Sequence, residues 1–231
     1  DCSIQRRYQK LVEEAPAPGL GEELRSHMHE AAVTYARRLG YRGAGTVEFL
    51  VDLERGSFYF LEMNARIQVE HPVTEAITGV DLVAEQIAVA EGQPLRLRDV
   101  SLSGHAIECR INCEDWLQDF RPTPGTVTRF AVPVGSGLRV DTHLQAGDEI
   151  PPYYDSLVAK LIASGRDRAE AVERLRSALA RFTVEGVATT VPMHLALTRE
   201  PEFLAGGVDT AWFPRFLQRA GAAAATSGQP A

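Results

Sequence analysis

The 231-residue sequence lacks an apolar run of about 18 residues, so we expect no membrane-spanning helix. Positive charge is also limited. Its 24 Lys and Arg against 31 Asp and Glu give a net charge of −7, and no basic run occurs, which argues against a nucleic-acid-binding protein. With 45% hydrophobic residues, the chain is expected to form one large or two smaller globular domains.

Cysteine is scarce as well. Cys2, Cys109 and Cys113 are odd in number, which favours reduced thiols over a disulfide framework. Cys109 and Cys113 lack a second cysteine or histidine pair, so a zinc site is not predicted. No signal segment is recognisable, and we expect a cytoplasmic protein. An organellar matrix stays open, because the chain opens on Asp1 and a targeting segment would precede it.

Local patterns predict both helices and strands. Helical periodicity and capping signals indicate helices over residues 21–39 and 81–91, and a further helix that begins at Asp167. From Gly104 the pattern changes to short strands separated by proline and glycine turns. Residues 93–103 have no long apolar period and mark the expected domain boundary. The expected fold class is therefore α+β, with antiparallel sheets and helices.

Residues 62–70, EMNARIQVE, alternate polar and apolar side chains without a fault. In an extended strand such alternation places all polar members on one face. The polar members are Glu62, Asn64, Arg66, Gln68 and Glu70. Because they comprise ligating and acid–base groups, we interpret this face as a candidate site, against the alternative of an ordinary half-exposed strand.

The sequence from residue 45 to residue 62 is typical of a β-hairpin. If its turn is centred near Arg55, Glu48 lies directly opposite Glu62. Facing like charges destabilise a sheet unless a cation neutralises them. Together with Asn64, the two carboxylates predict a site for a hard ion such as Mg²⁺. A bulge in the glycine-containing turn would slip the register by one residue and separate the pair.

Longer blocks of sequence follow one another in a specific order. They are DCSIQRRYQK at residues 1–10, EEAPAPG at 13–19, GYRGAGTVEF at 40–49, EMNARIQVEHPVTE at 62–75, GHAIECRIN at 104–112 and IPPYYDSLVAKLI at 150–162. This set resembles the signature blocks of biotin carboxylases, which belong to the ATP-grasp superfamily. The resemblance extends to about Phe216.

The resemblance implies a domain organisation. Residues 1–98 are expected to form the carboxyl-terminal part of an ATP-grasp fold, an antiparallel sheet with helices. Residues 99–219 are expected to form a mainly β biotin carboxylase carboxyl-terminal domain with helices. Residues 220–231 carry only small and polar side chains and are expected to be a flexible tail or linker.

The resemblance also implies a reaction. In this family ATP activates bicarbonate as carboxyphosphate, and carbon dioxide passes to the ureido nitrogen of biotin on a carrier. ATP, Mg²⁺ or Mn²⁺, and carrier-bound biotin are therefore expected. The implied partners are a biotin carboxyl carrier protein or domain, a carboxyltransferase component and a second copy in a homodimer, with neither nucleic acid nor membrane. Acetyl-CoA or another acyl-CoA is the expected final acceptor, while pyruvate and urea stay open.

Nucleotide and metal roles follow from the matched positions. The resemblance implies that Glu48 and Glu62 hold metal ions that bridge the nucleotide phosphates, supported by Asn64. It places Leu50 against the adenine ring. Gln5 matches a position near the nucleotide sugar.

Tyr8 is a departure within the same nucleotide-binding block, because many members of the family have histidine there. The resemblance implies that Arg66, Gln68, the backbone of Val69 and Lys10 hold bicarbonate.

Two roles are implied for the transfer chemistry. Glu70 matches the general base, and Arg110 matches the arginine that stabilises the biotin enolate. Alternation over residues 108–112 places Glu108 and Arg110 on one face. The alternative for Arg110 is a surface ion pair with Glu108 or Glu114.

Two other classes of function stay open. One is a different ATP-grasp carboxylate–amine ligase, and the other is a non-catalytic dimerisation or docking region. The glycine-rich lid, the nucleotide-clamping lysines and the amino-terminal domain of the family are missing from this sequence. The chain therefore resembles the carboxyl-terminal half of a biotin carboxylase, and we expect negligible turnover from it alone.

Overall fold

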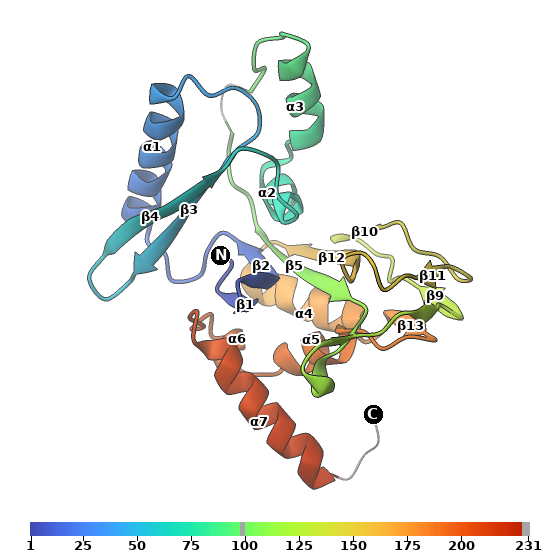
Figure 1. The fold of residues 1–231 in the computed structure, drawn as a ribbon. Coiled ribbons are helices and arrows are strands. Elements are labelled where there is room, and N and C mark those ends of the chain that lie inside the picture. The colour runs from blue at the N-terminus through green and yellow to red at the C-terminus, as the bar shows by residue number, and fades with distance from the viewer. Residues whose placement is uncertain (98–99, 228–231) are drawn as a thin grey trace. The chain divides into compact units, whose positions relative to one another are not determined.

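The computed structural model describes residues 1–97 and 100–227 (Figure 1). The chain divides into two compact units. The larger unit combines residues 1–16 with the chain from Gly104 onward, and the smaller unit comprises Ala17–Ser103. Helices and antiparallel sheets occur in both units, which confirms the α+β fold class.

An antiparallel five-stranded sheet forms the centre of the larger unit (Figure 1). In spatial order its strands are β1 (Ile4–Arg6), β2 (Gln9–Ala15), β5 (His105–Asn112), β12 (Leu157–Gly165) and β10 (Leu138–Thr142). Because β2 pairs directly with β5, residues near the start of the chain lie beside residues about a hundred positions later.

Short strands and turns extend this unit. They are β6 (Glu114–Asp115) with β7 (Arg121–Pro122), β8 (Gly125–Thr126) with β11 (Glu149–Ile150), β9 (Arg129–Ala131) with β13 (Thr183–Glu185), and the 3₁₀ helix η1 (Trp116–Gln118). Strands predominate from Gly104 to Gly165, as expected, whereas four α-helices occupy much of the described chain after that point.

Helix α4 (Arg168–Leu179) packs against the central sheet (Figure 1). Asp167 caps it by accepting a hydrogen bond from the Glu170 amide at 2.8 Å, as the sequence predicted. The expected apolar face is buried; its members are Val172, Leu175, Leu179 and Phe182. Burial of each such side chain contributes about 1.5–3 kcal/mol.

The remaining helices complete the core of the larger unit. They are α5 (Val191–Leu197), α6 (Pro201–Leu204) and α7 (Trp212–Ser227). Trp212 and Phe216 of α7 stack with ring centroids 5.4 Å apart, and Trp116 also stacks with Phe216 at 6.5 Å. Phe203 of α6 is fully buried. These aromatic rings therefore contribute large apolar surfaces to the core of this unit.

The described residues of the smaller unit form one β-hairpin and three helices. Its elements are α1 (Glu22–Arg38), β3 (Thr46–Asp52), β4 (Ser57–Asn64), α2 (His71–Thr78) and α3 (Leu82–Ala90). Tyr35 of α1 contacts Phe60 of β4, with ring centroids 5.1 Å apart. The helices expected over residues 21–39 and 81–91 are confirmed as α1 and α3 with their caps.

Three expectations about local structure need comment. The strand expected over residues 62–70 ends at Asn64, and α2 begins at His71. Residues 220–227 continue α7 where a flexible tail was expected, because a run of alanines favours a helix. The predicted boundary between residues 98 and 99, and residues 228–231 of the predicted tail, lie outside the described residues.

Across the described part of the chain, none of the helices has the length and apolar character required to cross a bilayer.

Candidate active site

The predicted site residues are divided between the two units. Glu48, Leu50, Glu62, Asn64, Arg66, Gln68, Val69 and Glu70 belong to the smaller unit. Gln5, Tyr8, Lys10 and Arg110 belong to the larger unit.

The β3–β4 hairpin brings Glu48 and Glu62 directly opposite each other, as predicted. Counting residues back from the observed turn does not by itself give this pairing. Near the turn Asp52 pairs with Ser57 and Phe49 with Phe60, and this register would place Leu61 opposite Glu48. An irregularity between Glu48 and Phe49 shifts the register by one residue. Such a bulge turns the following side chains over, and Glu62 therefore shares a face with Glu48.

The two carboxylates converge on one amide. Asn64 Nδ2 donates to Glu48 Oε1 at 3.2 Å and to Glu62 Oε1 at 2.9 Å. A shared donor offsets part of the repulsion between two facing carboxylates. The two carboxylates and the amide are hard oxygen donors, so the set fits Mg²⁺ or Mn²⁺. Among the described residues, no cluster of three or more His, Cys, Asp or Glu side chains forms a metal site, so an ion here would take its other ligands from substrate or water.

Arg66 and Gln68 join the same network from a loop. Arg66 Nη2 donates to Asn64 Oδ1 at 3.1 Å, and Gln68 Nε2 donates to Glu48 Oε1 at 2.8 Å. Gln68 is 8% exposed, and its Oε1 atom is buried without a hydrogen-bond partner. The expected common strand face for these residues is therefore wrong, but the loop still gathers them around Glu48 and Asn64.

Helix α2 explains why the strand ends. Pro72 lies in its first turn, where the fixed φ of proline favours a helix start. Val69 and Glu70 form the turn before it, and the Glu70 carbonyl accepts from the Val73 amide at 3.2 Å. His71 Nδ1 bonds the Gln68 carbonyl at 2.8 Å, which fixes the end of the loop.

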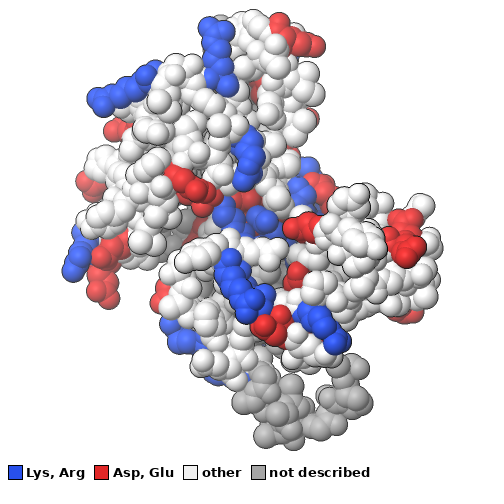
Figure 2. Space-filling model, viewed as in Figure 1, with Lys and Arg blue, Asp and Glu red and all other residues white. Residues whose placement is uncertain are grey.

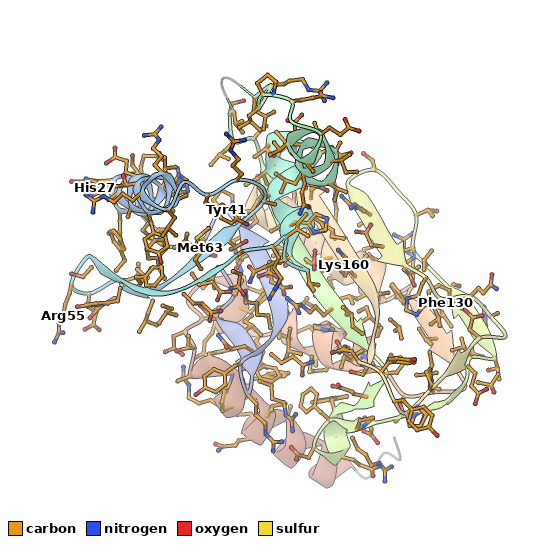
Figure 3. All side chains as sticks on the ribbon, turned by 45° about the horizontal axis from the view of Figure 1, so that its top comes forward. His27, Tyr41, Arg55, Met63, Phe130 and Lys160 are labelled. Atoms are coloured by element: carbon orange, nitrogen blue, oxygen red, sulfur yellow. The ribbon has the colours of Figure 1, made fainter. Side chains whose placement is uncertain are left out.

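Leu50 lies two residues from Glu48 on the same face of β3 and is 48% exposed. Its cross-strand partner is Tyr59, which is 52% exposed. The sequence interpretation missed Tyr59, although the hairpin register identifies it. Figure 3 shows Arg55 at the tip of this hairpin and Met63 nearer its base. An apolar surface therefore continues from the carboxylate pair toward the tip.

Gln5 and Lys10 are direct partners across the β1–β2 hairpin of the larger unit. The turn between these strands consists of Arg7 and Tyr8, whose φ angles of 50° and 67° are both left-handed. A two-residue turn with two positive φ angles suits the twist of a hairpin. Tyr8 is 95% exposed at its tip. Gln5 Nε2 donates to the Cys2 carbonyl at 3.1 Å.

Arg110 lies on β5 and forms an ion pair that the sequence did not predict. Its Nε donates to Glu13 Oε1 on β2 at 2.6 Å, and the Arg110 side chain is only 14% exposed. This contact forms because strand pairing brings β2 against β5. Burial, with Glu13 and Glu108 nearby, raises the pKa of the Cys109 thiol well above its usual value, so Cys109 is a packing residue.

Acidic and basic side chains are interspersed over the face shown in Figure 2. The predicted site residues of each unit lie on strands or on the turns and loops next to them.

Two family models match consecutive parts of the chain. The carbamoyl-phosphate synthase L chain ATP binding domain matches residues 1–98, and the biotin carboxylase C-terminal domain matches residues 108–215. The chain belongs to the biotin carboxylase family.

Curated biotin carboxylases are similar to this chain over almost its whole length. The biotin carboxylase of a Nostoc species is 54% identical over 214 residues, which are 92% of this chain and 48% of that protein. Biotin carboxylase 1 of Bacillus subtilis is 52% identical over 212 residues, which are 91% of this chain and 47% of that protein. The chain spans about half the length of these curated relatives.

A solved structure shows the same similarity at the level of the fold. The biotin carboxylase domain dimer of Hydrogenobacter thermophilus 2-oxoglutarate carboxylase, in complex with MgADP, ADP and bicarbonate, has a TM-score of 0.90 and 48% identity. The match covers 93% of this chain and 48% of that one.

Proposed function

We propose that the complete protein containing this chain carboxylates carrier-bound biotin, using ATP and bicarbonate. Bicarbonate attacks the terminal phosphate of ATP to give carboxyphosphate and ADP. Carboxyphosphate then releases carbon dioxide and phosphate. The phosphate takes the ureido proton of biotin, and the deprotonated nitrogen attacks carbon dioxide. The observation that supports this most directly is the hydrogen-bonded cluster of Glu48, Glu62 and Asn64, extended by Arg66 and Gln68.

Glu48 and Glu62, with Asn64, would hold the Mg²⁺ or Mn²⁺ ions. When bound, such ions neutralise the charge of the nucleotide phosphates during phosphoryl transfer. Leu50 offers an exposed apolar surface beside the carboxylates for the adenine ring. Gln5 and Tyr8 are proposed as contacts to the nucleotide from the β1–β2 hairpin.

Bicarbonate binding is assigned to side chains that suit a small oxyanion. The planar fork of Arg66 matches two carboxylate-like oxygens, and Gln68, the Val69 backbone and Lys10 supply further donors. Glu70 is proposed as the general base that takes the bicarbonate proton.

Arg110 would stabilise the negative charge on biotin after the ureido proton leaves. A preorganised cation at the atom where charge develops lowers the barrier, because it needs no rearrangement during the reaction.

We propose a biotin carboxyl carrier protein or domain and a carboxyltransferase component as partners, and a homodimer as the assembled state. Acetyl-CoA or another acyl-CoA is the proposed acceptor, to be compared with pyruvate and urea in an acceptor assay. A cytoplasmic location is proposed from the three sparse free cysteines. Because the chain spans about half the length of its relatives, we propose that turnover requires the rest of the protein.

The test is Glu62→Gln in the complete enzyme, with Glu54→Gln in the exposed turn of the same hairpin as control. We expect Glu62→Gln to lower bicarbonate-dependent ATP hydrolysis at least a hundredfold and to weaken Mn²⁺ binding measured by electron paramagnetic resonance. Glu54→Gln should match the unsubstituted enzyme. Full activity of Glu62→Gln would refute the proposed metal role and favour a docking function.

A further inference from the structure

Arg110 is held from several directions by residues distant in sequence. Its Nε donates to Glu13 Oε1 at 2.6 Å across 97 positions of the chain. Its backbone carbonyl accepts from His194 Nε2 at 2.7 Å and from Thr190 Oγ1 at 3.1 Å. An arginine in an ordinary surface ion pair would not be expected to have contacts from two separate segments, β2 and the start of α5.

The two side chains that donate to the Arg110 carbonyl are uncharged and buried. Burial lowers the pKa of His194 to about 4, despite the opposing effect of its bond to the Arg110 carbonyl, so the imidazole is neutral at pH 7. Since a carbonyl oxygen only accepts, Nε2 must carry the proton. Thr190 also accepts from the Asn112 amide at 3.0 Å, so it bridges two residues of β5. The strand that carries Arg110 is thereby fixed.

The side chain of Arg110 is held by a buried carboxylate, that of Glu13. Glu13 is 1% exposed and lies directly opposite Glu108, which is 0% exposed. Two facing buried carboxylates need a nearby cation. A charge-assisted bond to Nε also sets the direction of the guanidinium plane, because the five N–H groups of arginine form a rigid fork.

A second cation lies across the sheet from Arg110. Lys160 of β12 is the direct partner of Arg110 on β5, and Figure 3 labels Lys160. Lys160 Nζ pairs with Asp141 Oδ2 at 3.2 Å, on the side away from β5. Glu13 thus contacts Arg110, and Asp141 contacts Lys160 on the neighbouring strand.

We propose that Glu13 is a positioning residue for Arg110, which orients the guanidinium toward the charge that develops on biotin. This inference rests on the proposed function, in which Arg110 acts on biotin. Glu13 itself is not assigned a contact with substrate. Removing its charge should misdirect Arg110 and affect the biotin step while leaving carboxyphosphate formation intact.

The chain offers a matched control in the next residue. Glu14 is also buried, 4% exposed, and also pairs with an arginine, Arg168, at 2.9 Å. Because side chains alternate along β2, Glu14 points to the opposite face of the sheet from Glu13. Glu14→Gln therefore tests loss of a buried glutamate from the same strand without touching Arg110.

The experiment compares Glu13→Gln, Glu14→Gln and Arg110→Ala in the complete enzyme. Two rates are measured: carboxylation of free biotin, and bicarbonate-dependent ATP hydrolysis without biotin. We expect Glu13→Gln to lower kcat for biotin about tenfold or more, with KM for biotin and the biotin-independent rate changed less than about twofold. Glu14→Gln should leave the ratio of the two rates unchanged.

Each alternative outcome has a distinct meaning. Equal loss of both rates in Glu13→Gln, as for a general folding defect, would overturn the positioning role. An unchanged biotin kcat in Glu13→Gln, with a loss in Arg110→Ala, would overturn it while preserving the proposed function of Arg110. A normal biotin kcat in Arg110→Ala would overturn the role of Arg110 itself. If Glu13→Gln does not fold, Glu13→Asp replaces it, because Asp retains the charge but holds it farther from Arg110 Nε. We then expect the same result, a lower kcat for biotin with a nearly unchanged rate of ATP hydrolysis without biotin.

Discussion

Replacing Arg168 with methionine should destabilise the larger unit strongly. Arg168 Nε and Nη2 donate to Glu14 Oε2 and Oε1 at 2.9 and 3.2 Å, and Glu14 is 4% exposed. Arg168 also bonds the Leu204 carbonyl at 2.9 Å, and its guanidinium lies 5.1 Å from the centre of the Phe203 ring. After the substitution Glu14 keeps its contact with His105, whose Nε2 lies 2.8 Å from Glu14 Oε2.

The size of the effect follows from the buried position of the pair. Removing one partner of a buried ion pair costs roughly 3–5 kcal/mol, because the other charge is left without full compensation. For a protein of this size, 1 kcal/mol corresponds to roughly 2–4 °C in Tm. We therefore expect Arg168→Met to lower Tm by about 10 °C.

Tryptophan fluorescence is the natural assay for this prediction. The sequence contains two tryptophans, Trp116 and Trp212, and both belong to the larger unit. Thermal unfolding followed by their emission at pH 7.5 therefore reports on that unit.

The control is Arg129→Met, because Arg129 and Glu185 form an exposed ion pair with side-chain exposures of 65% and 54%. Such pairs contribute roughly 0–1 kcal/mol. An Arg168→Met shift no larger than that of Arg129→Met would refute the reasoning.

Three further predictions concern pH, thiols and backbone strain. Burial raises the pKa of Glu14, but its bonds with His105 and Arg168 outweigh burial and lower the net pKa from 4.5. The stabilisation it provides is thus complete above about pH 4.5 and is lost as pH falls through the lowered folded pKa, so the Tm gap between the unsubstituted chain and Glu14→Gln should shrink on acidification. Burial raises the pKa of the Cys113 thiol to about 11 and that of Cys109 well above its usual value, whereas Cys2 is only half-buried. Titration of the native chain with a thiol reagent at pH 8 should therefore modify about one cysteine. Rapid modification of all three cysteines would contradict this. Gly186→Ala should lower the free energy of unfolding by roughly 1–3 kcal/mol in denaturant unfolding, because φ is 98° and a Cβ would lie 2.1 Å from the Thr126 carbonyl oxygen. Gly147→Ala should lower it less, because φ is 95° but the space around a Cβ is open. Equal losses would show that the close contact is irrelevant.

Helix ends were predictable because their signals are local. Asp167 was predicted as a cap and accepts the hydrogen bond that the pattern required. The helix over residues 21–39 was likewise marked by acidic residues in its first turn and basic residues in its last. Such signals lie within a few residues of one another, so sequence alone contains them.

The carboxylate pair was predicted, but its register was not fully understood. Counting across the observed turn pairs Phe49 with Phe60, and only the shift beside Glu48 brings Glu62 into position. A bulge depends on strand twist and packing, and the alternating pattern of the sequence does not specify it.

The run after Asn64 was misassigned because period-two alternation continued into a turn. Pro72 competed with that pattern and favoured the start of α2 instead. The Glu13 partner of Arg110 was missed for another reason. β2 and β5 are distant in sequence, and their pairing is a property of the whole fold.

The strand β5 is enclosed on both sides, by β2 and by β12. The matched biotin carboxylase C-terminal domain begins at residue 108, whereas β2 ends at Ala15. A protein trimmed to the segment from Gly104 onward would thus lose β1 and β2 and turn an interior strand into an open edge. Unsatisfied amides and carbonyls along His105–Asn112 would then invite intermolecular pairing. The first 16 residues are in this sense part of the architecture of the carboxyl-terminal region, and excising them risks aggregation.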